Sequence, residues 1–544
     1  MPDPELGCIR EFPSPCVRLR ADGAFISTMA EGSDRVRVDI GERVSLEDVV
    51  AVAGGAAVEL GPEARARMEA SRAVVEEKVR AGETVYGVTT GFGALADVRI
   101  EPPAAALLQE RIVRSHAVAV GPLLSREEAR AMLFLRAHVL ALGRSGVRPL
   151  LVEQMAELLN RDLVPAVPEQ GSLGASGDLA PLAHLALPLL GRGAVLGPDG
   201  RPVPAGEAMA RAGLSPIALE AKEGLALVNG TQGMLAVGAL AAIRAAGLLR
   251  AADVAAAMTI EAALATDRPF DERLHRLRPH PGQAASAANL RRLLAGSAIV
   301  ASHRESAHLV QDAYSLRCAP QVHGAARDAL AYARAALEVE LGSVSDNPVV
   351  LAEDGEVLSG GNFHGQPVAV PLDALAVALV GVAGISERRL YRLLDPRTSN
   401  GLPAFLVREG GLNSGFMLAQ YTAASLVSES KGLAHPASVD SIPSSAGQED
   451  HVSMGMTAAR HLRAVVANAE VVVAMEALAA AQALDLRAPL RPAPGTAAAR
   501  DAVRARVPFL EEDRELGADV AAAVELVRSG ELAAAAEAAV GPLD

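Results

Sequence analysis

A glycine-rich stretch, GSLGASGDLAPLAH over residues 171–184, holds the residues whose types and spacing could do unusual chemistry. Ala175 offers a small, unhindered carbonyl, and Gly177 offers an amide nitrogen with no side chain to shield it. Ser176 stands between them with a β-hydroxyl that can leave. These three residues could cyclise their own main chain and lose water. The product would be an electron-poor alkene built from the backbone.

Three other interpretations of this stretch stay open on local sequence alone. A glycine-rich loop with Asp178 as N-cap and Pro181 in the first turn would simply begin a helix. Bare amides at a helix start attract phosphate, but the Lys-Ser/Thr of a P-loop is missing and Asp178 is negatively charged. The Gly174-x-Ser176 spacing begins a nucleophile elbow, but Asp178 replaces the second glycine and no strand precedes it.

Seven further motifs accompany ASGDLAPL along the chain. They are YGVTTGFG, SHA, EGLALVNGTQ, VQDAYSLRC, DNPV, GGNFHG and SIPSSAGQEDHVSMG. In these motifs and their order the chain resembles the aromatic amino acid ammonia-lyases, from about Val44 to the carboxyl end. The resemblance implies that Ala175, Ser176 and Gly177 form the 4-methylidene-imidazol-5-one (MIO) prosthetic group, with no external organic cofactor.

The resemblance also implies roles for other residues. Ammonia loss from an α-amino acid must break a weakly acidic Cβ–H bond and expel a poor leaving group, so an electrophile and a base are both needed. Tyr86 matches the catalytic base of the family, and Tyr314 matches a residue beside the reacting centre. Arg317 is the expected partner of the substrate carboxylate, because a guanidinium binds two oxygens at once.

The remaining pocket residues are expected from the same motifs. Asn229 resembles the amide that hydrogen-bonds the prosthetic group or the amino-acid end of the substrate. Gln311 is expected against the substrate or the prosthetic group, on one helical face with Tyr314 and Arg317 if that segment is helical. Asn362 and Phe363 are similar to residues that line the pocket.

Two sites bear on the choice of substrate among histidine, phenylalanine and tyrosine. The polar pair Ser115-His116 resembles the pair that histidine lyases carry. Glu449 could accept an imidazole N–H or relay its proton, whereas a phenyl ring would leave this charge buried and unpaired. Glu449 is therefore expected both to bind substrate and to act in catalysis.

The resemblance thus implies conversion of L-histidine to trans-urocanate and ammonia by a homotetramer whose active sites combine loops from three subunits. One alternative keeps the chemistry but makes the substrate tyrosine or phenylalanine, or makes the enzyme an aminomutase. An alternative of a different class is a catalytically silent helical scaffold or binding module, in which the glycine-rich loop never cyclises.

The elements that must position these residues are predicted to be mainly helical. Among the 544 residues 50% are hydrophobic and 3% aromatic, with no tryptophan and much alanine, which favours closely packed helices. Long apolar segments predict a helix bundle. They cover residues 233–265, 320–343, 367–394, 412–433 and 455–485. We expect an extension over 1–40, a smaller, loop-richer helical domain with the tripeptide over 41–235, and the bundle with C-terminal helices over 236–544.

Charge and cysteine content limit the partners. A net charge of -14 argues against the basic face that nucleic-acid binding requires. Cys8, Cys16 and Cys318 form no CxxC pair, so neither a zinc ribbon nor a disulfide framework is indicated, and a reducing cytoplasm fits. The amino terminus carries charges and prolines where a signal peptide would need an apolar core. We expect a cytoplasmic enzyme with a small-molecule substrate.

Two further kinds of site are not expected. The apolar run from Val368 is long enough to span a membrane, but Pro371 and Asp373 interrupt it, which favours a buried bundle helix. Three histidines in or close to the polar motifs could suggest a metal site, but their spacing matches no metal-binding helix pattern. These histidines are His364, His435 and His451.

Overall fold

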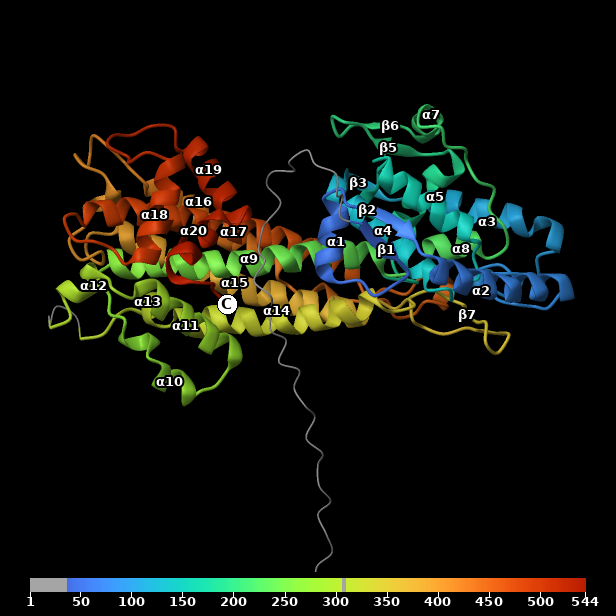
Figure 1. Cartoon of the computed structure of the whole chain (residues 1–544), viewed down its shortest axis with the longest axis horizontal. Helices are drawn as coiled ribbons and strands as arrows, with labels where there is room; N and C mark the ends of the chain where they lie inside the picture. The colour runs from blue at the N-terminus through green and yellow to red at the C-terminus, as the bar shows by residue number, and fades with distance from the viewer. Residues whose placement is uncertain (1–36, 306–309) are drawn as a thin grey trace, which may run out of the picture.

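The computed structural model describes residues 37–305 and 310–544, and within them the chain is mainly helical. Five long helices form the body of the molecule (Figure 1). They are α9 (Gln232–Ala262), α14 (Ala319–Leu341), α15 (Gln366–Leu394), α16 (Met417–Leu433) and α17 (Gly455–Leu486). The prediction of a mainly α fold with a long-helix bundle is confirmed. Helix α16 begins later than the predicted residue 412, and Gly415 just before it has a left-handed φ of 53°.

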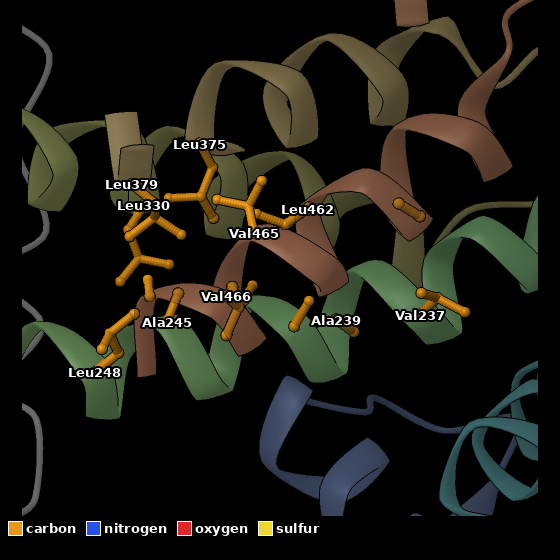
Figure 2. Packing of buried hydrophobic residues seen from close by; sticks show 14 of the residues in the cluster. Val237, Ala239, Ala245, Leu248, Leu330, Leu375, Leu379, Leu462, Val465 and Val466 are labelled. Atoms are coloured by element: carbon orange, nitrogen blue, oxygen red, sulfur yellow. The ribbon is translucent and has the colours of Figure 1, made fainter. Parts of the chain in front are cut away.

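Small and aliphatic side chains hold the long helices together. Helices α9 and α17 are buried along most of their length, and alanine is frequent in both, so their backbones can approach closely. Figure 2 shows Val466 of α17 against α9, between Ala239 and Ala245 of that helix. Leu375 of α15 joins the same core. Each such side chain stabilises the fold by about 1.5–3 kcal/mol, so the bundle is a rigid support.

Three of these helices are apolar and long enough to cross a membrane, by length and composition only: α9, α15 and α17. In this fold they pack against one another, and 72%, 56% and 78% of their most apolar windows lie buried inside the protein. The polar interruption in α15 is accommodated, because buried Asp373 accepts a hydrogen bond from the Ser438 amide at 2.8 Å. The run from Val368 is therefore a bundle helix, as predicted.

Four of the long helices, α9, α14, α15 and α17, share the end at which the glycine-rich loop lies. Helix α9 begins beside the end of α14, since Thr231 donates to Glu340. Helix α17 begins beside the loop, since the Met454 amide donates to the Leu173 carbonyl at 3.3 Å. At the opposite end, Arg487 after α17 donates to the carbonyl of Ala262, the last residue of α9. Helices α9 and α17 therefore run in the same direction, away from the loop.

The chain before α9 forms a smaller group of short elements. Ser45 caps the first helix with a capping box, and Pro62 begins the second. The strand β1 begins at Arg37, inside the segment predicted as an extension; residues 1–36, with Cys8 and Cys16, lie outside the described residues. The helices are α1 (Leu46–Ala53), α2 (Pro62–Ala81), α3 (Pro102–His116), α4 (Arg126–Ala141), α5 (Pro149–Asn160), α6 (Leu179–Ala186), α7 (Ala205–Arg211) and α8 (Glu223–Val228).

The described strands make four two-stranded sheets, β1 with β2 in parallel and the other three antiparallel. The strands are β1 (Arg37–Ile40), β2 (Ala57–Leu60), β3 (Val120–Leu123), β4 (Pro168–Gln170), β5 (Ala194–Leu196), β6 (Pro202–Pro204), β7 (Val349–Leu351) and β8 (Glu356–Leu358). The remaining helices are α10 (Glu272–Arg276), α11 (Pro281–Leu294), α12 (Ala298–Ser302), α13 (Tyr314–Arg317), α18 (Pro494–Arg506), α19 (Leu516–Arg528) and α20 (Glu531–Val540).

Candidate active site

The Ala175-Ser176-Gly177 tripeptide forms a tight turn between β4 and α6. Gly174 and Gly177 pair across it as an antiparallel bridge, and Ser176 and Gly177 have left-handed φ values of 52° and 77°. A Cβ at Gly177 would lie 2.0 Å from the Gly230 carbonyl oxygen, so the backbones of these two glycines are in direct contact. A left-handed serine costs conformational energy and persists only where its surroundings hold it. The turn is therefore fixed by backbone packing that requires glycine.

Asp178 holds this turn onto the start of α9. It precedes α6 as expected, but its carboxylate makes no capping bond to that helix, which corrects the sequence-based interpretation. It accepts hydrogen bonds from the Met234 amide at 2.8 Å and the Ser172 hydroxyl at 2.7 Å. Complete burial raises the pKa of Asp178 to about 6, although these hydrogen bonds oppose the rise. The carboxylate thus links the glycine-rich loop to the start of α9 instead of capping the start of α6.

The raised pKa of Asp178 predicts a pH-dependent stability. The folded chain binds this proton more tightly than the unfolded chain, so the contribution of Asp178 is fully present below about pH 4 and is lost as the pH rises to about 6. Relative to Asp178→Asn, the chain should lose at most about 3 kcal/mol of unfolding free energy over this range. Melting temperatures of both chains from pH 4 to 7, in a Ser176→Ala background, would measure this. A difference between them that does not change with pH would contradict the prediction.

Asn229 lies on the other side of the tripeptide, just before Gly230. Its side-chain amide nitrogen donates to the Asn347 carbonyl at 3.1 Å, while its buried Oδ1 has no hydrogen-bond partner among the described residues. The Gly230 amide donates to the Ser176 carbonyl at 3.2 Å, and the Asp178 amide donates to the Gly230 carbonyl at 2.8 Å. The Asn229-Gly230 segment therefore lies along the turn, bonded to it at two points.

Glu449 and His116, two residues expected to select the substrate, approach the tripeptide from different segments. Glu449 Oε1 lies 3.5 Å from the Ser176 hydroxyl, and Glu449 Oε2 accepts a 2.8 Å hydrogen bond from Ser444. At the end of α3, His116 Nδ1 lies 3.1 Å from the Ser115 hydroxyl. Burial lowers the pKa of His116, while the Ile112 carbonyl and the negative charge of Glu449 partly oppose this shift. The carboxylate of Glu449 therefore lies close to the Ser176 hydroxyl and also acts electrostatically on the His116 imidazole.

The Tyr86 loop reaches the same region. The Tyr86 hydroxyl accepts a hydrogen bond from the Gly93 amide at 3.3 Å, and the next amide, of Ala94, donates to the Ser445 hydroxyl at 3.1 Å. Ser445 belongs to the segment that carries Glu449. The loop with Tyr86 is thus hydrogen-bonded to the segment that faces Ser176.

Asn362 and Phe363 belong to the same end of the bundle. The Asn362 amide donates to the Val344 carbonyl at 3.1 Å, close to Ser345, which bonds Gln232 at the start of α9. The next residue, His364, stacks on His451 with ring centroids 5.9 Å apart. Among the described residues, no group of three or more histidine, cysteine, aspartate or glutamate side chains is placed to hold a metal ion.

Gln311, Tyr314 and Arg317 lie at the far end of the bundle from the tripeptide. Their segment is bonded to the chain just after α9, since the Thr266 amide donates to Asp312 at 2.9 Å. Helix α9 has 31 residues and spans about 45 Å, with Ser176 near its start. Within one chain, therefore, Arg317 and the tripeptide cannot contact the same small molecule.

Tyr314 and Arg317 lie on one short helix, but Gln311, which was expected on the same helical face, does not. Helix α13 covers Tyr314–Arg317, so Gln311 precedes it and does not share its helical face. The Arg317 guanidinium lies 4.6 Å from the centre of the Tyr314 ring, and Tyr314 is 71% exposed. Arg317 Nε is buried without a hydrogen-bond partner in the described part of the chain. The pair thus combines an exposed tyrosine ring with a guanidinium that has an unused hydrogen-bond donor.

Arg136 is a residue near the tripeptide that the sequence motifs did not indicate. It lies fully buried in α4 and donates to the Asn229 carbonyl at 2.8 Å and to Gln232 at 2.6 Å. The one available signal was a charged residue within an otherwise apolar helical run, MLFLRAHVLAL. Buried charges of this kind are costly unless they serve a site or are well paired.

Comparisons with known proteins identify the family of this chain. Residues 44–505 match the family described as aromatic amino acid lyase. The chain is 55% identical over 514 residues to a histidine ammonia-lyase from Sorangium cellulosum, covering 93% of this chain and all of that protein, and 54% identical over 507 residues to one from Myxococcus xanthus, covering 93% and 99%.

Solved structures give the same result. A histidine ammonia-lyase from Trypanosoma cruzi matches with a TM-score of 0.86 at 44% identity, covering 93% of this chain and 96% of that one. A tyrosine aminomutase from Streptomyces globisporus matches with a TM-score of 0.88 at 40% identity, covering 94% and 100%. Sequence and fold agree over nearly the whole length, and this chain therefore belongs to the aromatic amino acid lyase family.

Proposed function

We propose that this chain is a histidine ammonia-lyase, which converts L-histidine to trans-urocanate and ammonia. The observation that carries the proposal is the position of Glu449, with one carboxylate oxygen 3.5 Å from Ser176 and its negative charge acting on His116. A carboxylate in this position can accept the N–H of a substrate imidazole, and a hydrocarbon ring would offer it no donor. The histidine ammonia-lyases at 53–57% identity support this choice of substrate.

The tripeptide fits the MIO group that the family uses. The turn is closed between Gly174 and Gly177, Ser176 is held with a left-handed φ, and a Cβ at Gly177 would be blocked by Gly230. Asn229 Oδ1, buried without a partner in the described part of the chain, is a polar atom available at this position. When formed from Ala175, Ser176 and Gly177, the group supplies an electrophilic alkene carbon for activating the amine or the ring of the substrate.

The other residues supply binding and proton transfer in this proposal. Tyr86 takes the β-proton, and Glu449 with Ser115 and His116 holds the imidazole. Asn229, Asn362 and Phe363 line the pocket around the amino-acid end. Arg317 binds the substrate carboxylate as a bidentate pair, with Tyr314 and Gln311 beside it.

In one chain Arg317 lies the length of α9 away from Ser176, so the proposed site takes its arginine from another copy of the chain. We therefore propose a homotetramer with active sites shared between subunits, which matches the expectation from the family resemblance. A cytoplasmic location fits histidine degradation and the three cysteines outside any CxxC pair.

Incubation with L-histidine tests the proposal directly. Urocanate has a conjugated side chain and absorbs in the ultraviolet where histidine does not, so product formation can be followed continuously. The same assay with L-phenylalanine and L-tyrosine should give much weaker signals. Faster release of a cinnamate or coumarate would move the chain to the phenylalanine or tyrosine lyases, and a β-amino acid product would make it an aminomutase. No product from any of the three would favour a silent scaffold.

Glu449→Gln should harm the use of histidine selectively. The amide keeps the size of the side chain but cannot accept a proton, and general acid–base groups typically contribute about 10²–10⁴-fold to rate. We expect kcat for L-histidine to fall by about a hundredfold, while inhibition by L-phenylalanine stays close to that of the unaltered chain. Steady-state kinetics with both compounds would measure this. An equal loss for both would mean that Glu449 only supports the loop.

A further inference from the structure

A small cluster of buried charges lies behind the Asn229-Gly230 segment. Lys222 Nζ donates to Asp346 Oδ2 at 2.7 Å, and both side chains are fully buried. Arg136 is also fully buried, and the negative charge of Asp346 acts on it electrostatically. The cluster therefore holds two cations and one anion. Burial lowers the pKa of Arg136 to about 10, so the guanidinium remains charged at neutral pH.

Besides Gln232, Arg136 contacts the peptide bond between Asn229 and Gly230. Its Nη1 donates to the Asn229 carbonyl at 2.8 Å, and the other end of that same peptide, the Gly230 N–H, donates to the Ser176 carbonyl at 3.2 Å. A Cβ at Gly230 would lie 2.3 Å from Arg136 Nη1, so the guanidinium packs directly against this glycine. The arrangement is a continuous chain of hydrogen bonds from a buried cation to the carbonyl of the reactive serine.

A buried arginine with a purely structural role is expected to have acceptors for its N–H groups. Arg130, six positions earlier in α4, is such a case: it bonds the carbonyls of Val52 and Leu159 and the carboxylate of Asp162. Arg136 differs, because its Nε and Nη2 are buried with no acceptor in the described ranges. Buried donors without acceptors are uncommon and call for a reason.

We propose that Arg136 is a positioning residue that polarises the Asn229–Gly230 peptide and so strengthens the hydrogen bond from Gly230 to the Ser176 oxygen. Hydrogen bonds in a chain reinforce one another, and a charged donor at one end increases the effect. This inference rests on the proposed function. A nucleophile that adds to the Ser176 side-chain carbon donates its lone pair to form the new bond, and the alkene π pair moves towards the Ser176 carbonyl oxygen. Arg136 stabilises the charge that collects there, and the adduct finally takes up one proton.

Trapping with cyanide tests this without turnover. Cyanide adds to an electron-poor alkene, so the chain gains the mass of one HCN, and the rate of this gain reports on the electrophile. Intact mass before addition shows whether the chain has lost two waters on maturation. In Arg136→Met we expect the matured chain to be trapped about tenfold more slowly, the effect of one charge-assisted hydrogen bond. The kcat for histidine should fall by a similar factor with KM little changed.

A second variant covers the case in which Arg136→Met fails to mature or fold. Gln232→Glu has the same shape, keeps an oxygen towards Arg136 and places a negative charge against the guanidinium. It should also slow trapping, while Arg130→Met, the matched loss of a buried arginine from the same helix, should leave the rate unchanged. Matured Arg136→Met or Gln232→Glu trapped at the rate of the unaltered chain would overturn the inference. An unaltered chain that shows neither water loss nor trapping would instead overturn the proposed function.

Discussion

Ser176→Ala is expected to abolish ammonia release from L-histidine while leaving the fold intact. The hydroxyl of Ser176 is the group that must leave to create the alkene, and alanine has none. Its backbone φ of 52° is held by the pairing of Gly174 with Gly177 and by the contact of Gly177 with Gly230, which do not involve the hydroxyl. A loss of about a thousandfold or more is expected, because the electrophile supplies most of the barrier reduction.

Mass and spectroscopy separate this effect from unfolding. The unaltered chain should be lighter than its sequence by two water molecules, and the variant should show no alkene, with unchanged helical content by circular dichroism. Ser71→Ala is a matched control, since the Ser71 hydroxyl is buried and donates to the Met68 carbonyl within α2. That control should keep both activity and the mass deficit. Substantial turnover by Ser176→Ala would refute the proposed chemistry.

Two inactive variants should restore activity when assembled together. In the proposed site, Ser176→Ala removes the electrophile and Arg317→Ala removes the carboxylate partner, so each variant alone should be inactive. If a site takes these two residues from different chains, an equal random mixture leaves about one site in four with both intact. Co-expression with two different affinity tags, followed by sequential purification, would isolate mixed oligomers for the histidine assay.

The design includes its own control. A chain that carries both changes, co-assembled with the Ser176→Ala chain, has no intact electrophile and should stay inactive. Recovery to about a quarter of the unaltered activity would support shared sites. Mixed oligomers that remain inactive would mean that Arg317 serves another purpose, because the separation of Ser176 and Arg317 along α9 excludes a site within one chain.

The sequence predicts the helices that carry this site better than it predicts the contacts between distant segments. Apolar periodicity located α9, α14, α15 and α17 closely, because each must bury a wide face over many turns. Helix starts also have a local basis, as the capping box of Ser45 and Asp48 at the start of α1 shows. Helix bounds and caps depend on residues that are close in the sequence, so they can be predicted from local sequence patterns.

Connections between distant segments were not predictable in the same way. Asp178 has the expected position for capping α6, yet its carboxylate bonds the start of α9, because tertiary contact offered it a better partner than its own helix. The buried charge of Arg136 and the 3.5 Å approach of Glu449 to Ser176 depend on how helices cross. The resemblance to a family indicated Glu449, whereas no motif indicated Arg136.

The direct contact between the backbones of Gly177 and Gly230 separates what this scaffold can vary from what it must keep. Main-chain atoms at Gly177 and the buried side chains of Arg136 and Gln232 at Gly230 leave no room for a Cβ, so the turn can stay unchanged while the side chains that contact substrate are exchanged. An engineer seeking a lyase for a different amino acid would therefore diversify Ser115, His116 and Phe363, and would leave both glycines out of the library.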